Sequence, residues 1–281
     1  MSEIETNELL REWRESAPYW REHNATIRSM FAPVTQALIK AAGIVEGDAV
    51  LDVAGGPGEP SLTIAEIVGP TGSVTCTDAV AEMVAAAESE ARRRGLTNMT
   101  FRQCLADSLP FESNSFDAVV SRLGAMFFPD PLAALSEMLR VTRLEGALAL
   151  AVWDKSELNP FGYVVTEVMK HYIEMPTADP DSPGAFRFAE SGKLAHMLSA
   201  AGATGVLERP LGFRIEAPIA REKFWEMRVG TSGTLREKLA TLPPEQACRA
   251  ALDVQGAVRE FFPNDQISFP AQMIIVTGRK A

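Results

Sequence analysis

The residues whose types and spacing most clearly suit ligand chemistry form a glycine-rich turn in the segment VLDVAGGPG (50–58). An apolar run leads into three glycines within four positions, and a helical stretch begins at Ser61. Glycines let the backbone approach a ligand closely, and the free N–H groups at the start of a helix bind anionic or polar groups. The segment therefore predicts a ligand-binding turn, and a tight strand–helix turn without a ligand is the alternative.

Three aspartates follow successive predicted strands: Asp52 ends the first, Asp78 ends the second and Asp107 follows the third. The carboxyl ends of parallel strands meet at one edge of the sheet, so these carboxylates are expected to converge there. An acidic rim repels a pyrophosphate and attracts a cation, which favours S-adenosylmethionine, a nucleoside with a net positive charge. Alternatively, each aspartate caps the turn or helix that follows it.

A dinucleotide is the competing ligand for such a turn. Asp78 lies 20 residues after Gly58, at the spacing of a ribose-binding acid, but Ser61 stands where the G-x-G-x-x-G pattern needs its third glycine. An NAD(P)-dependent oxidoreductase is therefore the alternative enzyme. A cofactor-binding regulator without turnover is the non-enzymatic alternative, because a fold does not by itself imply catalysis.

Short apolar runs alternate with helical segments around this turn. Strands are expected at 49–53, 73–77, 98–104, 116–121 and 147–153, and helices at 61–68, 79–94 and 131–142. This alternation predicts an α/β fold with a Rossmann-like, mostly parallel sheet. Two later runs, 206–215 and 269–277, extend the expected sheet to seven strands with an antiparallel last strand.

The segments outside that alternation predict a helical cap over the carboxyl ends of the strands, where ligands bind in open α/β sheets. The expected division is 1–44 for N-terminal cap helices, 45–153 for the cofactor-binding core, 154–186 for a helical insertion or lid, and 187–281 for the end of the sheet, with cap helices inserted at 218–265. We interpret this organisation as one catalytic domain with a cap.

Longer segments resemble class I S-adenosylmethionine-dependent methyltransferases, in particular the subgroup around the ubiquinone/menaquinone-biosynthesis C-methyltransferases. The resemblance covers about 45–153, in the order of the family's motifs. Its segments are VLDVAGGPGE (50–59), TDAVAEM (77–83), ADSLPFESNSFDAVVSRLGAMFFPD (106–130) and LSEMLRVTRLEGALAL (135–150). One departure is Ala54, where the family usually has glycine.

The resemblance implies S-adenosylmethionine as the cofactor and assigns residues to each part of it. The glycine turn would line the methionine part, Asp78 would accept both ribose hydroxyls, Met83 would pack against the adenine, and Asp107 would bind the adenine amino group. The full set implied is Asp52, Ala54, Gly55, Gly56, Gly58, Asp78, Ala79, Met83, Ala106, Asp107, Ser108, Ser121 and Arg122.

Histidines and aromatic residues are the candidates for the acceptor side of the site. His23 and His171 are candidate general bases, needed only for a nucleophile that keeps its proton; His196 is interpreted as structural. Aromatic side chains in the cap segments predict an apolar or aromatic small-molecule acceptor, although they could simply attach the cap. The residues expected to form the pocket wall are Tyr19, Trp20, Phe127 and Trp225.

Composition limits the partners. The 281 residues include 27 Lys and Arg against 37 Asp and Glu, a net charge of -10 that lacks the basic surface of a nucleic-acid binder. No apolar run reaches the ~20 residues of a membrane helix, the N-terminus lacks a signal peptide's apolar stretch, and three scattered cysteines predict no metal site. A cytoplasmic enzyme of secondary metabolism is expected, either a monomer or a homodimer.

Overall fold

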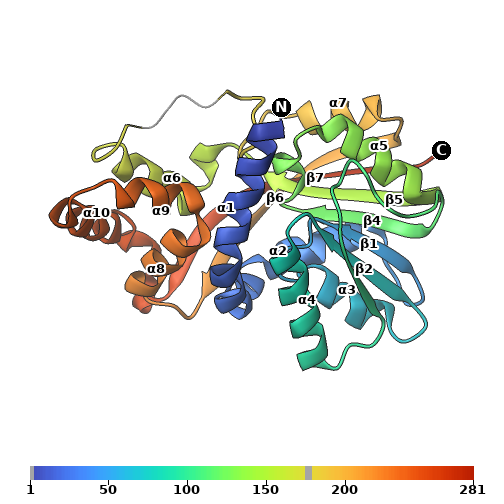
Figure 1. The fold of residues 1–281 in the computed structure, drawn as a ribbon, viewed down its shortest axis with the longest axis horizontal. Coiled ribbons are helices and arrows are strands. Elements are labelled where there is room, and N and C mark those ends of the chain that lie inside the picture. Colours follow the sequence, from blue (N-terminus) through green and yellow to red (C-terminus); the bar gives the residue numbers. More distant parts are fainter. Residues whose placement is uncertain (1–2, 175–178) are drawn as a thin grey trace.

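A seven-stranded sheet forms the centre of the protein (Figure 1), in a computed structural model that describes residues 3–174 and 179–281. Its order is β3-β2-β1-β4-β5-β7-β6, and β7 runs antiparallel to both of its neighbours. The predicted fold class is confirmed. The strands are β1 (Ala49–Val53), β2 (Ser73–Asp78), β3 (Met99–Gln103), β4 (Phe116–Arg122), β5 (Thr142–Trp153), β6 (Thr204–Ala217) and β7 (Ile267–Arg279).

Helices cover both faces of the sheet (Figure 1). One face packs against α2 (Asn24–Ala42), α3 (Ser61–Val68) and α4 (Ala81–Arg94), and the other against α5 (Pro131–Val141) and α7 (Lys193–Ala200). Successive side chains of a strand point to opposite faces. Accordingly, Val50 belongs to the apolar cluster of α2, and Leu51 to that of α5. The central strands read as continuous apolar runs because both of their faces are buried.

The sheet extends into the cap through β6 and β7. Pairing between β7 and β5 stops at Met273 on the cap side, and beyond it residues 212–217 of β6 pair only with residues 267–272 of β7. Between these strands the chain forms three of the cap helices. The cap helices are α6 (Pro160–Met169), α8 (Arg221–Thr231), α9 (Gly233–Ala240) and α10 (Pro244–Ala257), and short 3-10 turns lie at Ala125–Phe127, Ser156–Leu158, Arg259–Phe261 and Pro263–Asp265.

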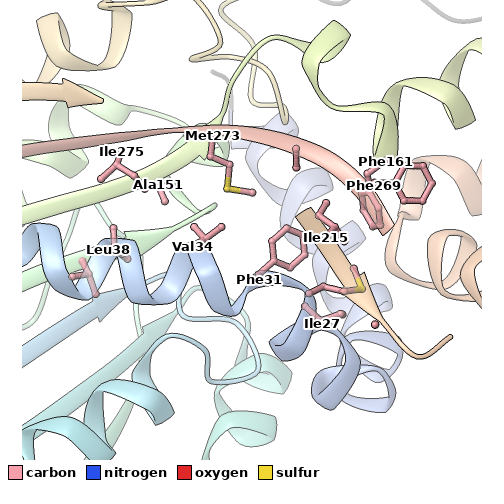
Figure 2. Close-up of a cluster of buried hydrophobic side chains, with 14 of the residues drawn as sticks. Ile27, Phe31, Val34, Leu38, Ala151, Phe161, Ile215, Phe269, Met273 and Ile275 are labelled. Carbon is pink, nitrogen blue, oxygen red and sulfur yellow. The ribbon is translucent and has the colours of Figure 1, made fainter. Parts of the chain in front are cut away.

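One apolar cluster joins the sheet to the cap (Figure 2). Phe31 of α2 lies 6.4 Å, between ring centroids, from Phe161 of α6, which in turn lies 5.7 Å from Phe269 of β7. The same cluster includes Met273 and Ile275 of β7 over the sheet. The cap is therefore attached to the sheet by the burial of shared apolar side chains, a contribution that is non-directional.

Helix α1 (Glu3–Glu22) lies between the sheet and the cap (Figure 1), in contact with α4 on one side and with α8 and α9 on the other.

β5 begins at Thr142, earlier than the expected 147. A register shift beside β4 and the exposed residues 143–145 interrupt its apolar pattern there. Among the residues that the structure describes, no helix has both the length and the apolar character needed to span a bilayer.

Candidate functional site

A cavity of about 570 Å³ lies at the carboxyl ends of β1, β2 and β4. Its floor is the turn after β1, with the residues that follow β2, β3 and β4 beside it. Its roof comes from α1, α6, the start of α9 and residues 227–231 of α8. Residues at the carboxyl edge of the sheet and residues of the cap segments therefore line the same cavity.

The glycine turn after β1 has two kinds of glycine. Gly56 has φ 55°, and a Cβ added there would meet no heavy atom within 4 Å. A Cβ on Gly55 would lie 2.7 Å from both Asp52 Oδ2 and Cys76 Sγ, and one on Gly58 would lie 2.5 Å from a methyl of Leu62. Gly56 therefore leaves room on the cavity side, whereas Gly55 and Gly58 allow close packing behind it.

Ala54, which stands where the family usually has glycine, has φ 59°. This left-handed conformation favours glycine because it crowds a side chain against the backbone. The methyl of Ala54 points toward the turn after β4, where a Cβ on Gly124 would lie 2.6 Å from it. Ala54 is accommodated because Gly124 has no side chain.

Asp78 lines the cavity and also holds the glycine turn. Its Oδ2 accepts the N–H of Gly56 at 3.0 Å, and its Oδ1 accepts the N–H of Val80 at 2.9 Å. Burial raises the pKa of Asp78 to about 6, against the lowering effect of these N–H groups. Each carboxylate oxygen has a further lone pair. Asp78 can therefore cap the turn and still accept ligand hydroxyls.

Asp52 lies beneath the turn and not in the cavity wall. It is fully buried, and its Oδ2 accepts both the N–H of Ser61 at 3.2 Å and the Ser61 hydroxyl at 2.6 Å. Burial raises the pKa of Asp52 to about 7. The expected convergence of three carboxylates is corrected to two, Asp78 and Asp107, because β1 continues to Val53 and Asp52 points toward the start of α3.

The other predicted cofactor residues divide in the same way. Five of them line the cavity, namely Ala79, Met83, Ala106, Asp107 and Arg122. Gly58, Ser108 and Ser121 lie outside its lining. Ser108 is exposed, whereas Ser121 is buried, and its hydroxyl would lie 2.7 Å from a Cβ on Gly124.

Glu59 and Arg122 connect the glycine turn to the neighbouring elements. Arg122 donates to Thr35 Oγ1 at 2.8 Å and to the carbonyl of Glu59 at 3.1 Å. The buried carboxylate of Glu59 forms an ion pair with Arg94 of α4 at 3.1 Å. The sequence did not identify Glu59 or Arg94 as site residues. The only indication was the Glu that closes the VLDVAGGPGE motif.

The predicted acceptor wall is partly in place. Trp20 and Phe127 line the cavity, and Trp13 joins them, its ring 5.0 Å from Phe127 and 6.0 Å from Trp20. Tyr19 and Trp225 lie in a separate shallow pocket beside α10. Phe31, Trp153 and Phe161 also line the cavity. They were missed because they come from three elements whose meeting the sequence does not show.

Neither candidate base lines the cavity. His23 lies at the junction of α1 and α2, and His171 is exposed after α6, with Nδ1 3.2 Å from the carbonyl of Val168. His196 is an exposed residue of α7, on the opposite face of the sheet. Over residues 6–174 and 179–281, the titratable groups in the cavity wall are carboxylates, Cys104 and two arginines, Arg122 and Arg228.

A glycine turn, an acid at the end of the next strand and a cap over a 3-2-1-4-5-7-6 sheet define the methyltransferase class of α/β proteins. A family model described as a methyltransferase domain matches residues 44–202, more than half of the 281 residues. The chain therefore belongs to the methyltransferase-domain family. The predicted resemblance to S-adenosylmethionine-dependent methyltransferases is confirmed.

Curated relatives match over part of their length. An uncharacterized protein of Mycobacterium tuberculosis is 40% identical over 124 residues, which are 44% of this chain and 44% of that protein. The ubiquinone/menaquinone biosynthesis C-methyltransferase UbiE of Bdellovibrio bacteriovorus is 39% identical over 125 residues, 44% of this chain and 52% of the relative. The chain thus spans about half the length of the curated relatives it matches.

Solved structures share the fold over more of the chain. The YcgJ protein of Bacillus subtilis has a TM-score of 0.54 at 23% identity, covering 88% of this chain and 97% of that one. A SAM-dependent methyltransferase of Aquifex aeolicus has a TM-score of 0.54 at 17% identity, covering 95% and 98%. At such identities the similarity is one of fold.

Proposed function

We propose that the protein transfers a methyl group from S-adenosylmethionine to a small molecule with an apolar or aromatic body. When bound, S-adenosylmethionine supplies an electrophilic methyl group on a positively charged sulfur. Family membership supports this reaction. The observation that carries the proposal is that Gly56, open toward the cavity, lies beside the Asp78 carboxylate in a space that is also lined by aromatic side chains.

The cavity wall fits the cofactor in shape and in charge. Ala54 to Gly56 would line its methionine part, Asp78 would accept the ribose hydroxyls, and Met83 and Asp107 would contact the adenine. Carboxylates outnumber the arginines in the described lining, which favours a cation over a pyrophosphate. The acidic residues of the lining are Glu12, Glu59, Asp78, Asp107 and Asp130.

On the acceptor side, the residues would act mainly by orientation. Trp13, Trp20 and Phe127 form a rigid wall that would hold a flat molecule and exclude water, and orientation alone can supply ~7–11 kcal/mol of a barrier. Methyl transfer forms a bond from the acceptor nucleophile to the methyl carbon while the carbon–sulfur bond breaks, its electron pair remaining on sulfur. His23 and His171 stay predictions as bases, as do the cytoplasmic location and a role in secondary metabolism.

The cofactor assignment is tested by calorimetry with S-adenosylhomocysteine. Asp78→Ala should weaken binding by ~1.5–3 kcal/mol through the loss of charged hydrogen bonds. Asp48→Ala is the matched control, because Asp48 also accepts a backbone N–H, that of Val45 at 2.9 Å, but lies at the opposite end of β1. Unchanged affinity of Asp78→Ala would mean that the ribose assignment is wrong.

A thermal-shift comparison separates the alternative functions. Stabilisation by S-adenosylhomocysteine and not by NAD(P) is expected, and the reverse would support an oxidoreductase. Labelled S-adenosylmethionine with a panel of phenols, quinones, amines and isoprenoids then tests turnover. Binding of S-adenosylhomocysteine without any labelled product would favour a non-catalytic regulator.

A further inference from the structure

Arg228 of α8 is a partly buried cation in the cavity wall, and it has no partner for its charge. It lines the cavity, and its Nε is shielded from solvent with no hydrogen-bond partner. Its guanidinium lies 4.8 Å from the centroid of the Phe161 ring. Within the described part of the chain, it makes no ion pair or hydrogen bond. Burial alone lowers the pKa of Arg228 to about 10, so the group remains charged at neutral pH.

Arg94 and Arg122 also each have one shielded nitrogen without a hydrogen-bond partner, but, unlike Arg228, they have polar partners for their other nitrogens, as does Arg187. Arg94 pairs with Glu59 and Glu90, Arg122 donates to Thr35 and to the carbonyl of Glu59, and Arg187 donates to the carbonyl of Phe128 at 2.6 Å. A buried charge without such a partner is costly, and it persists where something else compensates the cost. For Arg228, a contact with one aromatic face recovers only part of the lost hydration.

The residues around Arg228 indicate the shape of a ligand that could balance its charge. Phe161 lies beneath the guanidinium, and Phe31 lies 6.4 Å from Phe161 and 5.8 Å from Trp153. Arg122, beside the glycine turn, lies 6.0 Å from the Phe31 ring. Contacts between aromatic rings thus connect Arg122, at the cofactor end of the cavity, to Arg228.

We propose that Arg228 binds an oxyanion of the methyl acceptor, a carboxylate or an ionised phenol, while the flat apolar body of the acceptor lies along Phe31, Trp153 and Phe161. This inference rests on the proposed function and adds the substrate class. A guanidinium presents parallel N–H donors that match the two oxygens of a carboxylate.

The test compares an acid with its neutral isostere, 2-naphthoate with 2-naphthamide, by calorimetry on the full chain saturated with S-adenosylhomocysteine. The wild-type protein should bind the acid about tenfold or more tightly than the amide, the range of a charged hydrogen bond. Arg228→Met should lose this preference, and Arg228→Lys should keep part of it. Arg249→Met is the matched control, because Arg249 is an exposed arginine of the same cap, paired with Asp253.

A third probe distinguishes the two oxyanions. Binding of 4-nitrophenol that strengthens as this phenol ionises near neutral pH, where Arg228 keeps its charge, supports a phenolate, and acid-over-amide preference supports a carboxylate. Both effects must disappear in Arg228→Met. The inference is overturned if the wild-type protein shows neither effect, or if Arg228→Met retains them.

The ligand-free protein gives an independent readout. Replacing an uncompensated buried charge by a similarly long apolar side chain should raise the melting temperature of Arg228→Met above that of the wild type. A lower melting temperature would indicate a structural partner and contradict the inference.

Two outcomes separate this inference from the proposed function. If S-adenosylhomocysteine itself fails to bind the wild-type protein, the proposed function fails. If it binds but the acid and the amide do not differ in affinity, only the role of Arg228 fails.

Discussion

Asp78 is the last residue of β2 and Asp52 the last but one of the neighbouring β1, and the structure uses their carboxylates differently. The position of Asp78 was predictable, because the last side chain of a parallel strand lies at the ligand edge. The burial of Asp52 was not, since it depends on α3 packing over the face of the sheet that Asp52 shares with Val50. Ser61, which argued against a dinucleotide, is the residue that bonds Asp52. Together they fix the strand–helix turn from behind.

The buried carboxyl of Asp52 makes stability depend on pH. Its pKa rises from 3.8 to about 7 on folding, so between these values the folded chain binds more protons than the unfolded chain. The free energy of unfolding therefore falls as the pH rises through that window. Asn at position 52 cannot ionise. The free energy of unfolding of Asp52→Asn, relative to that of the wild type, should therefore rise by roughly 2–4 kcal/mol from the acidic to the alkaline end of this pH window.

Urea unfolding of both proteins across the window measures that difference. The Asn carbonyl can still accept both bonds from Ser61, so any fixed packing cost shifts all pH values equally. A constant difference between Asp52→Asn and wild type would mean that Asp52 is ionised throughout.

At the scale of elements, the sequence predicted which strands form the sheet better than where they end. The runs in β1, β2 and β4 are short and each is followed by a turn or helix signal, so their limits were close to correct. β6 is the edge strand of the sheet and includes Pro210, which an edge strand tolerates because one side has no partner strand. Its mixed polar and apolar pattern did not show that the carboxyl end of β6 continues, paired with β7, into the cap.

The turns after β1 and β4 fit each other through Ala54 and Gly124. Gly124→Ala should lower the free energy of unfolding by ~1–3 kcal/mol, because its Cβ would lie 2.6 Å from that of Ala54 and 2.7 Å from Ser121 Oγ. Ala54→Gly should be neutral or stabilising by up to about 1 kcal/mol, since φ 59° suits glycine.

The double variant tests whether these turns are coupled. Ala54→Gly should rescue part of the Gly124→Ala loss, with a coupling of ~0.5–2 kcal/mol in denaturant melts, and the contact with Ser121 should keep the rescue incomplete. Gly256→Ala in α10 is the control, because a Cβ there meets nothing within 4 Å. Strict additivity of Ala54→Gly and Gly124→Ala would show that the backbone relaxes and the turns act independently.

For the whole molecule, α1 links the two ends of the cavity. Ala17 packs with Val80 and Met83 below, and Trp20 donates its indole N–H to the carbonyl of Thr231 in the cap at 3.3 Å. The aromatic composition of this segment predicted a cap helix. Its placement between sheet and cap could not be predicted, because that depends on contacts with residues more than 200 positions away.

Because α1 forms part of the cavity roof, S-adenosylhomocysteine should slow its hydrogen exchange. Opening of α1 that requires release of the ligand is suppressed by mass action, by up to about 100-fold at 100 times the dissociation constant. Exchange mass spectrometry of the full chain should show protection at 9–20 as well as at 53–59 and 78–83, with none at α7 on the opposite face. Trp13→Ala, which removes the ring contact with Phe127, should weaken protection at 9–20 more than at 53–59. Protection confined to the glycine turn and 78–83 would show that the ligand enters and leaves without moving α1.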